Sequence, residues 1–197
     1  LEKEGEVNRY IRGIDACANE IGCRPEVFAQ YYRYLLDYSY KEEDGSSHNL
    51  MATYHVGEDF FDIVDGLRAI DEVMLFCGIY SGCRLGHALA LGINTENYYK
   101  YKGDVLVMPG QDLLDNLAWI LVKQCQYGCL VDDALKFVLE HKFNELFNEI
   151  YYRKELEYGS VTYLEYYNCW KLRGDCPDNY CLDEKEFSRR LELEPVR

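Results

Sequence analysis

The sequence predicts an α/β protein, because short apolar strands alternate with a helix in its first half. Residues 50–55 are apolar and rich in strand-forming side chains. From residue 60 to residue 77 apolar side chains recur every three or four positions, which predicts a helix, and Gly78 is expected to end it. A second short strand is expected at residues 83–85. Strands joined by a crossover helix run parallel, so both should end at one edge of a sheet.

Three side chains with catalytic chemistry follow these strands. His55 ends the first strand, Glu58 comes shortly after it, and His87 follows the second strand. A neutral imidazole is a common zinc ligand, which suits His55, whereas Glu58 would reach a substrate atom as a general acid or base. His87 would orient the attacking hydroxide. A His-x-x-Glu pair alone is more often a surface or capping pair, but its repeated placement after strands favours metal-assisted hydrolysis.

Three segments in the first half resemble motifs of the adenosine deaminase family, within the metal-dependent amidohydrolase superfamily. His55-Val56-Gly57-Glu58 is similar to the family's His-Ala-Gly-Glu. Arg84-Leu85-Gly86-His87-Ala88 is similar to Arg-Ile-Gly-His-Gly. Upstream, the segment from Gly13 to Glu20 resembles the family's strand-four segment, which ends Asp-Leu-Ala-Gly-Asp-Glu.

The resemblance implies a role for each matching residue. His55 would bind zinc, Glu58 would protonate the purine ring nitrogen, and His87 would assist the attacking hydroxide. In the family, a glycine backbone N–H contacts the substrate, and Ala18 occupies that place here. Asp15 keeps an acidic position in the same substrate-binding segment. The implied ligand is a purine nucleoside or nucleotide.

By this resemblance, the segment spanning residues 1–110 would hold strands four to six of a (β/α)8 barrel. The family's His-x-His motif occurs nowhere in the sequence, and the one Asp-Asp pair, at Asp132, is expected to cap a helix. A complete barrel takes about 250 residues, and this chain has 197 and begins at Leu1. We therefore expect a fragment of a larger protein, whose remaining zinc ligands come from missing barrel segments or other subunits.

The second half, residues 111–197, is predicted to be a mainly helical insertion. An extended run or short strand is expected first, at residues 104–109. Periodicity then predicts helices at residues 113–121, 132–152, 161–171 and 183–193. A loop at residues 173–180 should separate the last two helices. This half resembles the large bacterial adenosine-deaminase-like proteins associated with anti-phage defence.

Composition restricts the partners and the compartment. The net charge of −14 argues against binding to a nucleic-acid backbone or an anionic membrane, and no apolar run is long enough to span a bilayer. The nine cysteines form no Cys-x-x-Cys pair, which favours free thiols and a cytoplasmic location. Residues 41–48 have the composition of a solvated loop, so His48 is expected to be exposed there.

The 19 tyrosines occur in clusters that suit either subunit interfaces or half-buried helices, and the sequence does not decide between them. Open strand edges of a partial barrel would also need covering, so we expect a homo-oligomer.

Two functions therefore follow from the sequence. The first is part of a zinc-dependent deaminase acting on adenosine or a related purine, inactive as an isolated chain. The second is a non-catalytic assembly module derived from such an enzyme. An amidohydrolase with another substrate also stays open.

Overall fold

The computed structural model describes residues 10–17, 19–41, 45–128, 132–151 and 161–176 as a mixed α/β protein. The chain divides into two compact units. Unit 1 comprises residues 1–98 and 174–176, and unit 2 comprises residues 99–173 and 177–197.

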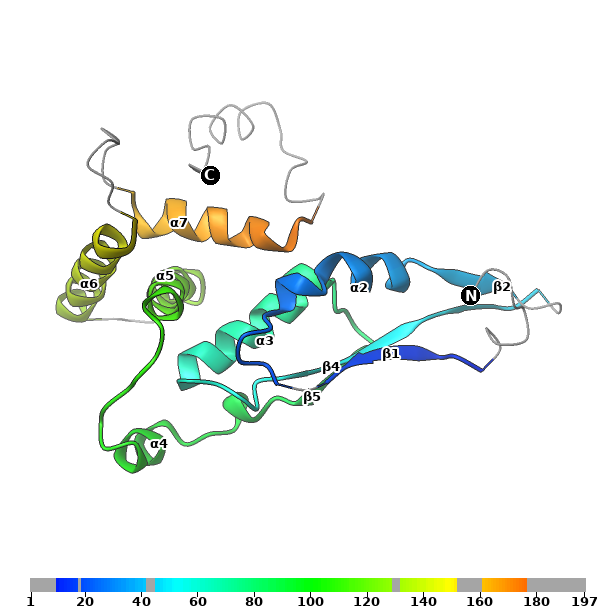
Figure 1. Ribbon diagram of the computed structural model, residues 1–197, viewed down its shortest axis with the longest axis horizontal. Helices are drawn as coiled ribbons and strands as arrows, with labels where there is room; N and C mark the ends of the chain where they lie inside the picture. The colour runs from blue at the N-terminus through cyan, green and yellow to red at the C-terminus, as the bar shows by residue number, and fades with distance from the viewer. Residues whose placement is uncertain (1–9, 18, 42–44, 129–131, 152–160, 177–197) are drawn as a thin grey trace. The chain divides into compact units, whose positions relative to one another are not determined.

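Unit 1 is built on a three-stranded parallel sheet. Strand β1 (Gly13–Ala16) pairs with β4 (Met51–Val56), which pairs in turn with β5 (Arg84–His87). The strands therefore lie side by side in chain order (Figure 1). This confirms the predicted parallel strands; a complete barrel is not formed by the described residues.

One face of this sheet is covered by helices. Ala52, Tyr54 and Val56 alternate along β4 and are all buried, and helices α2 (Ala29–Leu36) and α3 (Ile63–Cys77) pack against this strand (Figure 1). The Tyr32 ring of α2 lies 5.2 Å from the Tyr54 ring, and the Tyr32 hydroxyl donates to the Thr53 carbonyl. Because side chains alternate along a strand, Thr53 and His55 belong to the opposite face.

Helix α3 begins and ends where its sequence provides a cap. The Asp62 side chain accepts from the Ile63 N–H at 2.7 Å, so the helix starts there, slightly after the predicted residue 60. At the other end Gly78 adopts φ 68°, the left-handed conformation that glycine reaches without strain, as the sequence predicted.

The buried side of α3 carries an ion-pair network. Arg68 donates to Glu72 at 2.6 Å and to Asp65 at 2.9 Å, and all three side chains are almost completely buried. Arg24, which precedes the short 3-10 helix η1 (Pro25–Val27), donates to Glu72 at 2.6 Å and to Asp65 at 2.9 Å. Two guanidinium groups thus face two carboxylates, which neutralises the buried charge.

The predicted solvated loop at residues 41–48 is wrong in part. Strands β2 (Ser39–Lys41) and β3 (Ser47–Asn49) pair antiparallel, with Tyr40 opposite His48. Gly45, at φ 85°, lies between the strands, and residues 42–44 lie outside the described residues. His48 is exposed, as predicted, but on a strand. A polar composition does not prevent pairing here, since most of the hairpin faces solvent.

Cys77 provides a test of burial in unit 1. All cysteines among the described residues are free thiols, and Cys77 has no exposed surface. Burial raises the pKa of this thiol from its ordinary value of 9.0 to about 12. At pH 8, we expect alkylation of Cys77 by iodoacetamide to be at least ~100-fold slower in the folded protein than in urea, because only the thiolate reacts. Peptide mapping would measure both rates, and equal rates would contradict the burial.

The same shift has a consequence for stability. The thiol ionises at pH 9.0 in an unfolded chain but only at about 12 when folded. Its contribution to stability is therefore complete below pH 9 and is lost as the pH rises toward about 12.

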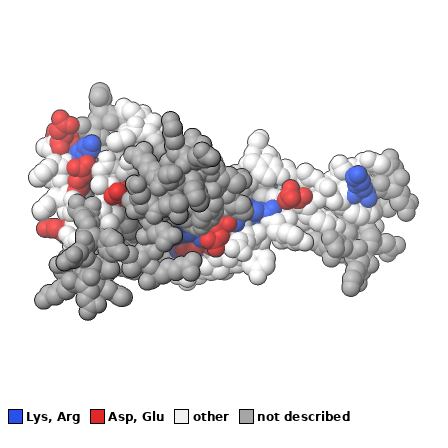
Figure 2. Space-filling model, turned by 90° about the horizontal axis from the view of Figure 1, so that it is seen from above, with Lys and Arg blue, Asp and Glu red and all other residues white. Residues whose placement is uncertain are grey.

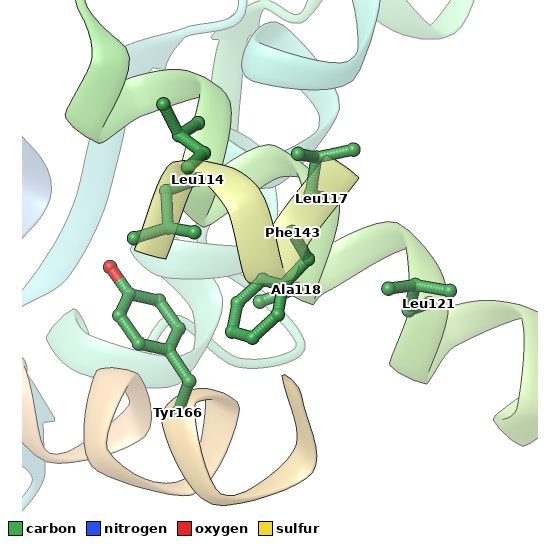
Figure 3. Packing of buried hydrophobic residues seen from close by; sticks show 7 residues of the cluster. Leu114, Leu117, Ala118, Leu121, Phe143 and Tyr166 are labelled. Atoms are coloured by element: carbon green, nitrogen blue, oxygen red, sulfur yellow. The ribbon is translucent and has the colours of Figure 1, made fainter. Parts of the chain in front are cut away.

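Unit 2 is a group of packed helices. Helices α5 (Gly110–Gln126), α6 (Asp133–Tyr151) and α7 (Tyr163–Trp170) surround one apolar cluster, in which Phe143 and Tyr166 pack against leucines of α5 (Figure 3). These three helices confirm the helices that the sequence predicts at residues 113–121, 132–152 and 161–171. The helix predicted at residues 183–193 lies outside the described residues.

The segments that connect the helices of unit 2 agree only in part with the sequence predictions. Residues 105–109 belong to no helix or strand, so the short strand considered at residues 104–109 is not formed. Asp132 accepts from the Ala134 N–H at 3.1 Å, which confirms that it caps α6. A short 3-10 helix, η3 (Lys171–Gly174), occupies the start of the predicted loop at residues 173–180. Helix α4 (Thr95–Tyr101) spans the boundary between the units.

A polar network lies beside the apolar cluster. Asp115 is buried, and Arg173 donates to both of its carboxylate oxygens, at 2.6 and 2.8 Å. The Tyr166 hydroxyl donates to the same carboxylate at 2.5 Å. Burial is the largest cause of a raised pKa of Tyr166, and the nearby negative charge of Asp115 raises this pKa further. These bonds satisfy a carboxylate that would otherwise be buried without partners.

The surface agrees with the composition. On the face that Figure 2 shows, the described Lys and Arg side chains stand singly or beside acidic side chains and form no continuous basic surface. Within the described ranges, no helix has the length and apolar character needed to cross a membrane.

Candidate functional site

The predicted site residues of β4 and β1 meet on the sheet face opposite α2 and α3. Asp15 lies opposite Thr53 in the strand register, so it shares a face with His55. His55 Nδ1 lies 3.0 Å from Asp15 Oδ1. A carboxylate on one ring nitrogen fixes the orientation of an imidazole and leaves Nε2 as the atom that binds a ligand or transfers a proton.

The other two predicted residues form a second pair at the same edge. His87 Nε2 lies 3.2 Å from Glu58 Oε2, and the His87 ring centroid lies 5.3 Å from that of His55. The side chain of Glu58 is 27% exposed and that of His87 50% exposed, so both can reach a ligand from solvent. The structure therefore brings together Asp15, His55, Glu58 and His87, all of them proposed from the sequence.

The backbone is strained at the end of β5, at His87 and the residue that follows it. His87 and Ala88 have φ angles of 56° and 48°, which residues other than glycine rarely adopt. The loop is held by bonds to the end of β4: Ala88 N–H donates to the Val56 carbonyl at 3.1 Å, and Ala90 N–H to the Gly57 carbonyl at 2.9 Å. Strain of this kind is retained when surrounding contacts fix a functional side chain.

One interaction at this edge was not foreseen from the sequence. The carboxylate of Glu20, in the loop after β1, accepts hydrogen bonds from the backbone N–H groups of Gly57, Glu58 and Asp59. In the sequence, Glu20 only ends the segment that resembles the family's strand four. Its partners are backbone groups of a distant loop, and residue spacing carries no signal for them.

Gly86 is required by the position of the His55 ring. A Cβ atom at residue 86 would lie 2.5 Å from His55 Cδ2. Gly86→Ala should therefore turn the His55 ring away from Asp15. Because His55 is partly exposed and can move, we expect the free energy of unfolding to fall by less than ~1 kcal/mol. The turnover rate of any reaction that uses His55 should fall by ~10- to 100-fold.

Urea unfolding and steady-state kinetics would measure the two effects of Gly86→Ala. Gly92→Ala is a matched control, since the nearest atom to its added Cβ would be the Leu89 carbonyl oxygen at 3.8 Å. Equal turnover in both variants would show that the His55 position is unimportant.

Two sequence predictions about ligands have different outcomes. Ala18 lies outside the described residues, so its backbone contact to substrate stays a prediction. For zinc, His55 is one candidate ligand, but the part of the chain that the structure describes contains no group of three or more His, Cys, Asp or Glu side chains able to hold a metal ion. Because a catalytic zinc takes three protein ligands, these residues do not fit the ion by themselves.

Comparison of the sequence with models of known protein families and with curated proteins found no match. The resemblance to adenosine deaminases therefore rests on the three short sequence motifs alone.

Proposed function

We propose that this cluster is the proton-transfer part of a hydrolytic deaminase site that acts on adenosine or a related purine nucleoside or nucleotide. The observation that carries the proposal is the contact between Glu58, which follows β4, and His87, which ends the neighbouring parallel strand β5. The Asp15–His55 pair lies beside it. Two acid–base pairs at one sheet edge suit a reaction in which protons are both taken up and delivered.

The proposed reaction replaces the purine 6-amino group by oxygen. A water oxygen forms a bond to C6, the bond from C6 to the amino nitrogen breaks, and ammonia leaves. In this scheme His87 takes a proton from the attacking water and delivers it to the departing amino nitrogen, which leaves as ammonia, and the remaining proton of the C6 hydroxyl returns to Glu58 as the carbonyl forms. Glu58 delivers a proton to the ring nitrogen next to C6, which makes that carbon a better electrophile. His55, which Asp15 orients, would lie beside the attacked carbon in this scheme.

No step of this scheme passes through a metal ion, because the described residues contain no group of three or more side chains able to hold one. If the protein holds zinc, His55 would be one ligand and segments outside the described residues, or other subunits, would supply the rest. We also propose a homo-oligomer, since apolar side chains such as Tyr31 and Tyr34 on α2 are about 70% exposed.

The proposal is tested by incubating the protein in its native assembly with adenosine, AMP and ATP. Conversion of the 6-amino purine to the 6-oxo purine is followed by ultraviolet absorbance, and cytidine serves as the control substrate. We expect at least one purine, but not cytidine, to be converted. An assembly module without activity would convert none of them, and that result would contradict the proposal.

A further inference from the structure

Glu20 occupies an unusual position for an acidic side chain near the proposed site. Its carboxylate lies in a concave arrangement of three successive backbone N–H groups, those of Gly57, Glu58 and Asp59. Oε2 accepts from Gly57 at 2.7 Å, and Oε1 accepts from Glu58 at 2.9 Å and from Asp59 at 3.2 Å. Successive N–H groups that converge in this way bind anions, and here the anion belongs to the same chain.

These bonds fix the turn that carries Glu58. Hydrogen bonds to an ionised acceptor are stronger than neutral ones, and three of them act on adjacent residues. Gly57, at φ 75°, gives the turn its shape, and its carbonyl accepts from Ala90 N–H at 2.9 Å. The turn is thus held through its N–H groups by the loop after β1 and through a carbonyl by the loop after β5. The Glu58 side chain, which contacts His87, starts from this fixed backbone.

We infer that Glu20 is a positioning residue for Glu58. Through the three backbone bonds it holds the Glu58 carboxylate against His87, and it has no contact with the substrate itself. The expected effect of Glu20 on catalysis rests on the proposed function. Its hydrogen bonds to the turn are a structural property, and they can be tested without any measurement of activity.

The first test compares amide hydrogen exchange in Glu20→Gln and in the unchanged protein. Glutamine keeps the size of the side chain but loses the charge and turns an N–H group toward the backbone donors. We expect the amides of Gly57, Glu58 and Asp59 to exchange at least ~10-fold faster in the variant, with little change elsewhere in unit 1. Asp37→Asn, at an exposed carboxylate of the same unit, is the matched control and should leave these amides unchanged. Unchanged exchange in Glu20→Gln would overturn the inference.

The second test separates positioning from general stability. We expect Glu20→Gln to lower kcat by ~10- to 100-fold while KM stays within ~3-fold, because a displaced Glu58 impairs the chemical step more than binding. In a Glu58→Gln background the same change should have little further effect, whereas independent effects would multiply. Multiplying effects, or an unchanged kcat, would show that Glu20 does not act through Glu58.

The outcomes distinguish the two proposals. If the unchanged protein converts no purine, the proposed function fails, and the exchange rates alone decide whether Glu20 holds the turn. If Glu20→Gln does not fold, Glu20→Asp gives the same readouts, since it keeps the charge but is too short to reach all three donors. Purine turnover with unchanged amide exchange in the variant would retain the function and remove the role of Glu20.

Discussion

Glu58→Gln is expected to lower kcat for purine deamination by a factor of about 10² to 10⁴, with the fold retained. The amide has the shape of the carboxylic acid but delivers no proton, and it also changes the partner of His87. The expected loss therefore falls on the chemical step rather than on binding. Steady-state kinetics with the purine that the protein converts fastest would measure it.

A matched control for this variant lies next to it in the chain. Asp59→Asn removes a carboxylate from the same turn, but the Asp59 side chain is exposed and has no place in the proposed reaction. It should keep kcat within ~2-fold. A Glu58→Gln variant as active as Asp59→Asn would remove Glu58 from the reaction.

Arg68→Met is expected to lower the free energy of unfolding by about 3–5 kcal/mol. Arg68 is 1% exposed and faces Asp65 and Glu72, which are also buried. Without it, Asp65 and Glu72 would lose one of the two guanidinium groups that the described residues place against them, and Arg24 would be the other. The methionine fills much of the same volume, so a cavity contributes little to the loss.

Urea unfolding of the whole chain, followed by far-ultraviolet circular dichroism, would measure this loss. Lys41→Met is the control, because it removes an exposed positive charge from the same unit and should change stability by less than ~0.5 kcal/mol. If both variants were equally stable, the network would not contribute to the fold.

The predictable part of the fold is the part encoded by local pattern. Helix α3 was predicted because its apolar spacing and Gly78 both act within the helix itself. The hairpin of β2 and β3 was missed because its pairing joins polar residues that carry no alternating pattern. The partners of Arg24 were also hidden, since they lie on a helix distant in the sequence and only the folded chain brings them together.

The candidate site follows the same division. His55, Glu58 and His87 were proposed from motifs, and strand order then places them at one edge. The contact of Asp15 with His55 depends on the register of two strands, which the motifs do not specify. The zinc remains a prediction, because its other ligands would come from segments that the motifs do not cover.

The most direct test of the central claim is the source of the oxygen in the product. The protein in its native assembly is incubated with its purine substrate in water enriched in oxygen-18, and the product is analysed by mass spectrometry while ammonia is quantified. Hydrolytic deamination predicts a 6-oxo purine that carries one solvent oxygen, with one ammonia released for each product molecule. Purine recovered unchanged, or a product without solvent oxygen, would contradict the proposed function.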